Sequence, residues 1–370
     1  MGLLLILLVV AHELGHAIAA MRNGVIVEEF GIGFPPRAWQ KKLKNGVLFT
    51  LNWLPLGGFV KLQGENDSAS KKGDYGATSV LKKTKILLAG VMTNWLIAAI
   101  LLTILAVFGL PKILPNQISI PNDTTIVGQP VEIASLTKNY PAATAGLREG
   151  DKIVRFANQE VPTIGSLLEV IKQNKGKEVA VIYNRDGVEQ TASVKLKDNN
   201  PKGIFGAGLG QRELIKATWS SPIVGIATTA QFTWVTLQGI GDLFSNLING
   251  LFLQLSPDSS VRENASTKLK TVGDSVAGPI GIIGTIFPQA GRAGLTELIF
   301  LTAIISLSLA VMNILPIPAL DGGRWFMLVI FRLLKKKLTK EREEKIQFVG
   351  FSVLMGLIIL VTIVDVTKLF

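Results

Sequence analysis

Four long and mostly apolar segments constrain the fold of this chain more than any other feature: residues 1–24, 86–110, 295–323 and 348–364. A helix needs about 20 apolar residues to cross a bilayer, where only helices and closed barrels satisfy their backbone groups. Hydrophobic residues make up 48% of the chain and charged residues only 18%. We therefore predict a polytopic α-helical membrane protein with about four transmembrane helices.

The basic residues are distributed as in a membrane protein. A net charge of +11 would also suit a protein that binds nucleic acid. The Lys and Arg residues, however, concentrate beside the apolar segments, in the stretches 25–85 and 324–345. Cytoplasmic loops of membrane proteins carry such an excess of positive charge. We therefore expect two cytoplasmic loops, with the lipid bilayer and not nucleic acid as the partner.

The first of these loops, residues 25–85, carries the signals of a small sheet. Asn45-Gly46 is a strong hairpin-turn signal. Four stretches around it have strand character, namely residues 25–30, 38–44, 47–53 and 59–62. Leu48, Leu51 and Trp53 are among side chains too apolar for a free cytosolic hairpin. We predict a membrane-associated β-sheet that lines a cavity, with a hairpin lying on the lipid headgroups as the alternative.

Residues 119–200 are soluble in character and alternate between strand and helix signals. Strand patterns occur at residues 131–135, 152–156, 178–183 and 188–196, and helical patterns at 141–147 and 164–174. A segment of about 80 residues can bury a modest core. The preceding span runs from the inside to the outside, so we expect an α+β domain on the extracytoplasmic side.

Residues 212–290 follow this insert, and the sequence leaves two arrangements open. Residues 217–250 contain no Lys or Arg and resemble a further span. The basic loop at 324–345 requires an even number of crossings between the second and third spans. We therefore favour interfacial helices on the outer leaflet, with two extra spans as the alternative.

The first apolar segment contains the pattern His-Glu-x-x-His. Residues four apart lie about 40° apart around a helix, so His12 and His16 share one face, and Glu13 falls within the same arc. Two imidazoles so placed can bind Zn²⁺, and the Glu can act as general base toward the water that the metal activates. The pattern also occurs by chance in soluble helices. Here both histidines of the chain lie in it, and a carboxylate in a membrane helix costs about 2.5–3.5 kcal/mol, which indicates a functional role.

A zinc ion held by two histidines needs a third protein ligand and an open position. The sequence has no third His and no Cys, so this ligand must be a carboxylate. Asp321 follows two prolines near the end of a span that crosses in the same direction as the first. The charges of Zn²⁺, Asp321 and Glu13 then sum to zero in a low dielectric. The alternative is an Asp that caps a helix or faces cytosolic water.

Asn94 interrupts the apolar surface of the second span. Polar and small residues in such a position usually mark contact between helices. An orientation toward the metal cavity, where Asn94 would bind substrate, is equally compatible with the sequence.

The chain resembles the site-2 protease family of intramembrane zinc metalloproteases, in particular the bacterial regulator of sigma-E protease type. The resemblance rests on HELGH in the first span, NxLPxPxLDGG from Asn313 to Gly323, and a soluble insert between them. Gly-rich stretches at residues 30–34 and 278–282 are further landmarks. The resemblance covers nearly the whole chain.

This resemblance implies a site and a substrate class. His12, His16 and Asp321 would hold Zn²⁺, Glu13 would be the catalytic base, and Asn313 would help to hold the substrate. The loop sheet would take up the unwound substrate as an added strand, with Leu48, Leu51 and Trp53 as substrate-binding residues. The insert would be a PDZ domain that filters substrates by size outside the bacterial plasma (inner) membrane. The substrates would be single-span membrane proteins, such as anti-sigma factors already cut by an upstream site-1 protease, or remnant signal peptides.

Two features depart from the family pattern, and two other functions remain to be weighed. The chain has room for one PDZ domain where many members have two, and Ala89-Gly90-Val91 stands where Ala-Gly-Pro is usual. A zinc-binding scaffold that holds substrates without cutting them is the main alternative, but ligation alone does not need Glu13. A metal transporter would need further polar groups along a path through the membrane.

Overall fold

The computed structural model describes residues 2–198, 204–254 and 294–369, with shorter pieces between 256 and 268. The chain divides into two compact units. The first, here called the membrane unit, comprises Met1–Thr103 and Gly225–Phe370, and the second, the inserted unit, comprises Ile104–Val224. Each unit is described by itself.

Four helices within the described residues are long and apolar enough to cross a membrane, which confirms the predicted number. They are α1 (Gly2–Arg22), α2 (Val80–Phe108), α9 (Leu295–Ile314) and α11 (Lys340–Leu369, apolar as far as Ile363). Many large apolar side chains on them are exposed, among them Leu3, Leu7, Ile100, Phe108, Phe348 and Ile359. Exposed apolar surface of this extent is expected of helices that contact lipid.

Two predicted boundaries are wrong at the basic ends of the apolar segments. Helix α2 begins at Val80 instead of residue 86, and the basic loop predicted at 324–345 is largely helical. That loop contains α10 (Asp321–Leu333) and the start of α11. The basic residues correctly marked polar ends of helices, but charge alone does not distinguish a loop from the charged end of a helix.

The predicted third span, 295–323, is two helices. Helix α9 ends at Ile314, and α10 begins at Asp321 after a short turn. Pro316 and Pro318 interrupt the helix because proline lacks a backbone N–H and clashes with the preceding turn. A Cβ on Gly322 would lie 2.1 Å from the carbonyl oxygen of Ile314, so only glycine permits this tight reversal. The reversal puts Asp321 at the start of a helix.

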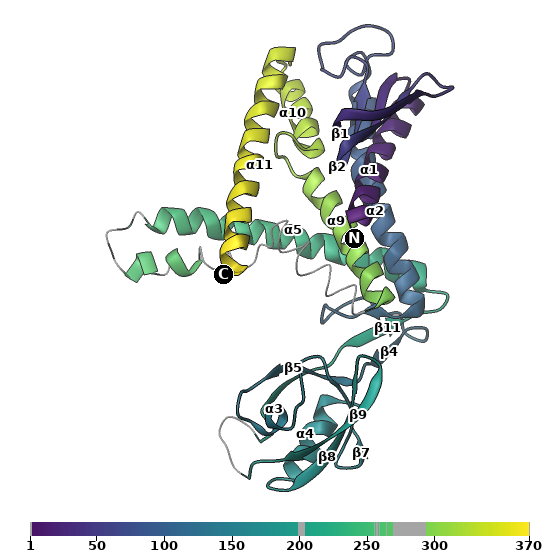
Figure 1. Ribbon diagram of the computed structural model, residues 1–370. Coiled ribbons are helices and arrows are strands. Elements are labelled where there is room, and N and C mark those ends of the chain that lie inside the picture. The colour runs from purple at the N-terminus through teal and green to yellow at the C-terminus, as the bar shows by residue number, and fades with distance from the viewer. Residues whose placement is uncertain are drawn as a thin grey trace. The chain divides into compact units, whose positions relative to one another are not determined.

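The predicted sheet is present, but its four stretches belong to two long antiparallel strands. These are β1 (Val27–Lys42) and β2 (Leu48–Leu62), which Asn45-Gly46 connects. Residues 29–32 of β1 pair with residues 58–61 of β2 and also with residues 48–51. The strands therefore bend and pair more than once, which local strand signals could not predict. Figure 1 shows the sheet beside α1, and Val27, Phe30 and Leu62 share a buried cluster with Ala17 and Ala20.

Ion pairs, some of them buried, connect the loop after β2 to three helices of the membrane unit. Lys83 on α2 is 0% exposed and forms an ion pair with Asp67. Arg324 on α10 pairs with Glu65 at 3.0 Å and with Glu343 on α11 at 3.3 Å. Both cations lie over the ring of Tyr75, 5.5 Å and 5.0 Å from its centroid. Burial raises the pKa of the Tyr75 hydroxyl above its ordinary value, so the hydroxyl stays protonated and the side chain uncharged.

We expect Asp67→Asn to destabilise the protein strongly. The substitution leaves the ammonium of Lys83 buried without its partner charge, which typically costs about 3–5 kcal/mol. Thermal unfolding in detergent measures the effect. Glu28→Gln is the control, because its pair with Lys61 is exposed and such pairs contribute about 1 kcal/mol or less. Equal, small effects of both variants would contradict the assigned role of Lys83.

The inserted unit contains the predicted α+β pattern. Its main sheet has the order β10-β5-β6-β8-β9, with β7 paired to β6. The elements are β5 (Val131–Leu136), β6 (Lys152–Phe156), β7 (Gln159–Glu160), β8 (Glu178–Arg185), β9 (Val188–Lys195), β10 (Ala207–Gly210), α3 (Pro141–Thr144) and α4 (Ile164–Gln173). Ile133, Phe156 and Leu167 lie in its core. A second sheet joins β3 (Leu110–Pro111), β11 (Glu213–Lys216) and β4 (Thr125–Gly128).

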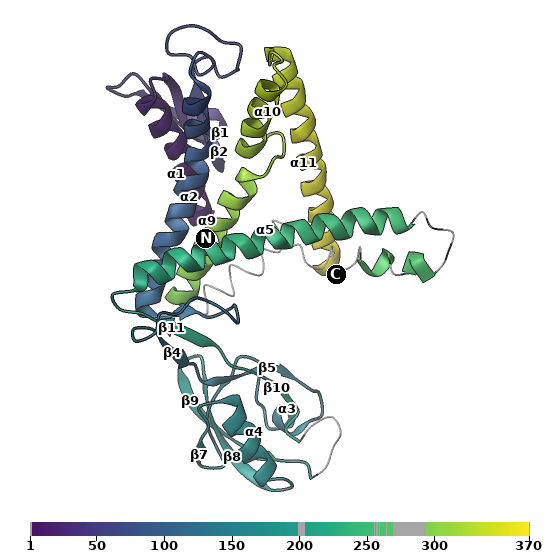
Figure 2. The same cartoon turned by 180° about the vertical axis from the view of Figure 1, so that it is seen from behind.

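The segment after the insert differs in part from the expectation. The predicted helical region 212–290 begins with strand β11, and its helix α5 runs from Ser221 to Gln254 without a break (Figure 2). Among the described helices, α5 is not one of those apolar enough to span. Residues 269–293, including the Gly-rich stretch 278–282, lie outside the described residues. The placement of α5 on the outer leaflet stays a prediction.

Candidate metal centre

Three side chains from two distant parts of the sequence converge in the membrane unit. Nε2 of His12 lies 3.0 Å from Oδ2 of Asp321, and Nε2 of His16 lies 3.2 Å from the same oxygen. The two Nε2 atoms are 3.2 Å apart. His12 and His16 lie on successive turns of α1, and Asp321 is the first residue of α10. Within the described residues, these three form the group that could hold a metal ion.

The donor atoms have the spacing that zinc requires. Zinc bonds of about 2.0–2.1 Å to nitrogen and oxygen give a tetrahedron with edges of about 3.3 Å. The three observed separations, 3.0 to 3.2 Å, come close to those edges. Two neutral imidazoles and one carboxylate are also a common donor set for catalytic zinc. The residues therefore fit this metal.

His16 is held in the orientation that a ligand needs. Its Nδ1 lies 2.8 Å from the carbonyl oxygen of Ile86. A carbonyl only accepts hydrogen bonds, so Nδ1 carries the proton and Nε2 presents its lone pair toward the centre. Helices α1 and α2 touch here, because a Cβ on Gly15 would lie 2.3 Å from Oγ1 of Thr93.

We expect Gly90→Ala to displace the histidines and to abolish zinc binding. A Cβ at position 90 would lie 2.3 Å from Nε2 of His16 and 2.7 Å from Nε2 of His12. Gly239→Ala in α5 is the control, since a Cβ there meets nothing within 4 Å. Zinc analysis of both purified variants measures the effect. A Gly90→Ala protein with a full zinc content would contradict this placement of the ligands.

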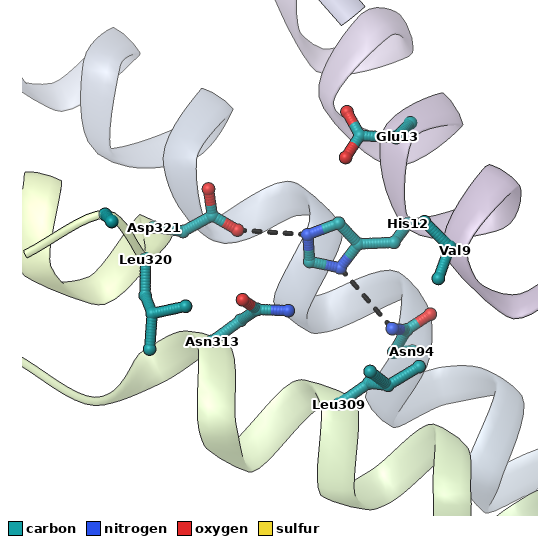
Figure 3. Close-up of a pocket in the computed structure, with 9 residues that line it drawn as sticks. Val9, His12, Glu13, Asn94, Leu309, Asn313, Leu320 and Asp321 are labelled. Carbon is teal, nitrogen blue, oxygen red and sulfur yellow. Dashed lines mark hydrogen bonds and ion pairs between the residues drawn. The ribbon is translucent and has the colours of Figure 1, made fainter. Parts of the chain in front are cut away.

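Glu13 lies beside the ligands but is not one of them. The backbone N–H of Val60 on β2 donates to its Oε2 at 3.1 Å. The carboxyl group faces a cavity of about 200 Å³ that His12, Asp321 and Asn313 also line. In Figure 3, the Glu13 carboxylate stands apart from the His12 imidazole and the Asp321 carboxylate, which face each other. A carboxylate so placed can exchange a proton with a molecule bound at the centre.

The structure brings some of the predicted substrate-binding residues to this cavity and not others. Asn313 on α9 and Asn94 on α2 both line it. Leu48, Leu51 and Trp53 lie on β2 and are not among its lining residues, and the Trp53 side chain is 71% exposed. Their assignment to substrate binding stays a prediction.

Three features of the centre were not identified in the sequence. The backbone N–H of Val60 and the carbonyl of Ile86 contact the site through atoms that every residue possesses, so no residue type signals them. Gly90 gave a weak signal, as a small residue in an apolar helix.

Comparison with known proteins assigns the chain to a family. The model of peptidase family M50 matches residues 1–357. The regulator of sigma-W protease RasP of Bacillus subtilis is 26% identical, with 98% of this chain and 96% of the relative covered. A proposed zinc metalloprotease of Clostridium perfringens is 30% identical over 362 residues, with 97% and 95% covered. A solved PDZ domain from Listeria innocua is 27% identical and covers 22% of this chain and 93% of its own, with a TM-score of 0.20.

The family match and the two relatives, together with the convergent histidines and aspartate, define a metalloprotease class. The chain belongs to peptidase family M50, the site-2 protease family. It is a zinc metalloprotease, and its described residues include four helices long and apolar enough to cross a membrane.

Proposed function

We propose that this protein is an intramembrane endopeptidase that cuts single-span membrane proteins within their apolar segments. The main support is that His12 and His16 of one apolar helix meet Asp321, which lies more than 300 residues away, within 3.2 Å. A metal-dependent hydrolytic centre between apolar helices suits a substrate that is itself apolar.

The residues of the centre divide into ligands and a base. His12, His16 and Asp321 would hold the zinc ion. When bound, zinc acts as a Lewis acid that polarises the peptide carbonyl and makes water more acidic. Glu13 would take the proton of the attacking water and later give it to the leaving amine. The hydrogen bond from the Val60 N–H would hold the Glu13 carboxylate beside the cavity that His12 and Asp321 also line.

Water needs a route to a centre between apolar helices. A second cavity, about 410 Å³ in volume, shares Ala319, Leu320 and Asp321 with the first. Its other walls are polar, and they include Glu65, Arg324 and Glu343. We infer that water enters from this polar side.

The substrate backbone would pair with the sheet. A helix hides its carbonyls, so a membrane-spanning substrate must unwind before hydrolysis, and an added strand gives its backbone new partners. The stretch around Gly58 and Val60 lies next to Glu13, which makes it the nearest strand to the base. Asn313 on the cavity wall would hold the substrate, while Leu48, Leu51 and Trp53 would contact its apolar side chains.

The charge pattern supports a location in the bacterial plasma membrane. The basic stretches would lie in the cytoplasm, and the inserted unit would lie outside as a PDZ domain that screens substrates by size. Anti-sigma factors first cut by a site-1 protease, and remnant signal peptides, would then be the substrates.

We expect removal of zinc to abolish cleavage, and this tests the proposed function. The purified protein in detergent would be treated with a chelator and then given zinc, magnesium or calcium. His and carboxylate donors at the observed spacing favour zinc over the two harder ions, so zinc alone should restore cleavage of a single-span substrate. Cleavage that persists in the zinc-free protein would refute the proposal.

A further inference from the structure

The second nitrogen of His12 faces Asn94 on α2. The side chain of Asn94 is 0% exposed, and its Nδ2 lies 3.4 Å from Nδ1 of His12 (Figure 3). The backbone carbonyl of Asn94 accepts a hydrogen bond from the hydroxyl of Ser306 on α9 at 2.8 Å. This contact holds the backbone of α2 at Asn94 against α9, and the side-chain amide of Asn94 faces the histidine.

Zinc binding determines what His12 needs from this neighbour. A histidine that binds through Nε2 must carry its proton on Nδ1, and this N–H needs an acceptor that fixes the ring. For His16 the acceptor is the carbonyl of Ile86. For His12 the group at hydrogen-bond distance from Nδ1 is the amide of Asn94.

The amide can supply this acceptor through its oxygen. With Nδ2 toward His12, Oδ1 of Asn94 is buried without a hydrogen-bond partner among the described residues. The nitrogen and oxygen of an amide have nearly the same shape, and a half-turn exchanges them. That half-turn pairs the unsatisfied Oδ1 with the Nδ1–H of the zinc-bound histidine.

We propose that Asn94 is a positioning residue whose Oδ1 accepts the Nδ1–H of His12 and thereby holds its Nε2 lone pair toward zinc. This proposal rests on the proposed zinc centre. It also assigns different kinds of acceptor to the two histidines: the acceptor of His16 is backbone and cannot be substituted, whereas that of His12 is a side chain.

The test replaces Asn94 by Leu, which has a similar size but no acceptor, and by Asp, which keeps an oxygen in place. Loss of a hydrogen bond behind a zinc ligand typically weakens metal binding by about 10- to 100-fold. We expect a loss of this size for Asn94→Leu in a zinc-chelator competition, and tighter binding by Asn94→Asp than by Asn94→Leu. Ser306→Ala is the control, because it loosens the same helix contact without touching His12.

A second readout separates orientation from packing. The chain has only two histidines, so nitrogen NMR of ¹⁵N-histidine-labelled protein resolves each ring. Asn94→Leu should change the Nδ1 signal of His12 and leave that of His16 in place. Zinc affinity within twofold of the wild type, or equal changes in both rings, would overturn the inference. A wild-type protein that binds no zinc would instead overturn the proposed function itself.

Discussion

Replacing Glu13 by Gln is expected to lower kcat for a single-span substrate by about 10²- to 10⁴-fold, the usual contribution of a general base. Gln keeps the size of the side chain and an oxygen that can accept the Val60 N–H. It cannot take up a proton from water. Single-turnover cleavage in detergent measures the loss.

Zinc content separates this effect from loss of the metal. Glu13 lies outside the group of three possible ligands, so the Glu13→Gln protein should retain as much zinc as the wild type. Glu28→Gln on β1, a half-exposed carboxylate, serves as the control and should leave both quantities unchanged. A Glu13→Gln protein that cleaves at the wild-type rate would contradict the role of Glu13.

Replacing Asp321 by Asn is expected to weaken zinc binding by more than about 100-fold, because it removes a charged ligand. Loss of a hydrogen bond behind a ligand, by comparison, typically weakens metal binding by about 10- to 100-fold. Cleavage should disappear wherever zinc is limiting. Zinc-chelator competition and cleavage at defined free zinc measure the two effects.

The matched control for Asp321 is Glu344→Gln. Glu344 is an exposed carboxylate on α11 that lines the neighbouring cavity, so its substitution removes the same charge without removing a ligand. An unchanged thermal midpoint in both variants would show that neither unfolds the protein. Equal zinc affinities in the two variants would argue against Asp321 as a ligand.

Periodicity predicted the parts of the site that lie within one helix. His12 and His16 share a face because helical geometry fixes the positions of residues four apart. The convergence with Asp321 required a tertiary argument, namely that the first and third spans cross in the same direction and that a buried charge needs partners. In the structure the three side chains lie together, and Asp321 begins a separate helix instead of ending a span.

Other features depend on contacts that no local pattern encodes. The bends of β1 and β2 arise from pairing between residues about 20 to 30 positions apart, such as Phe30 with both Phe49 and Val60. The first turns of α2 contain Lys83, which is buried in an ion pair with Asp67. From the sequence alone a lysine is expected to be exposed, so the sequence assigns these turns to the loop. The direction of Asn94 was undecided between two faces of its helix. The structure turns its side chain toward His12 and its backbone carbonyl toward Ser306.

The most direct test of the central claim is mass spectrometry of the products that the wild-type protein releases from a single-span substrate in H₂¹⁸O. If His12, His16, Asp321 and Glu13 form an intramembrane hydrolytic centre, the new carboxyl terminus should lie within the apolar segment and contain one ¹⁸O atom. The product should be missing in Glu13→Gln. Cleavage only in the soluble flanks of the substrate, or the same product from Glu13→Gln, would contradict the account.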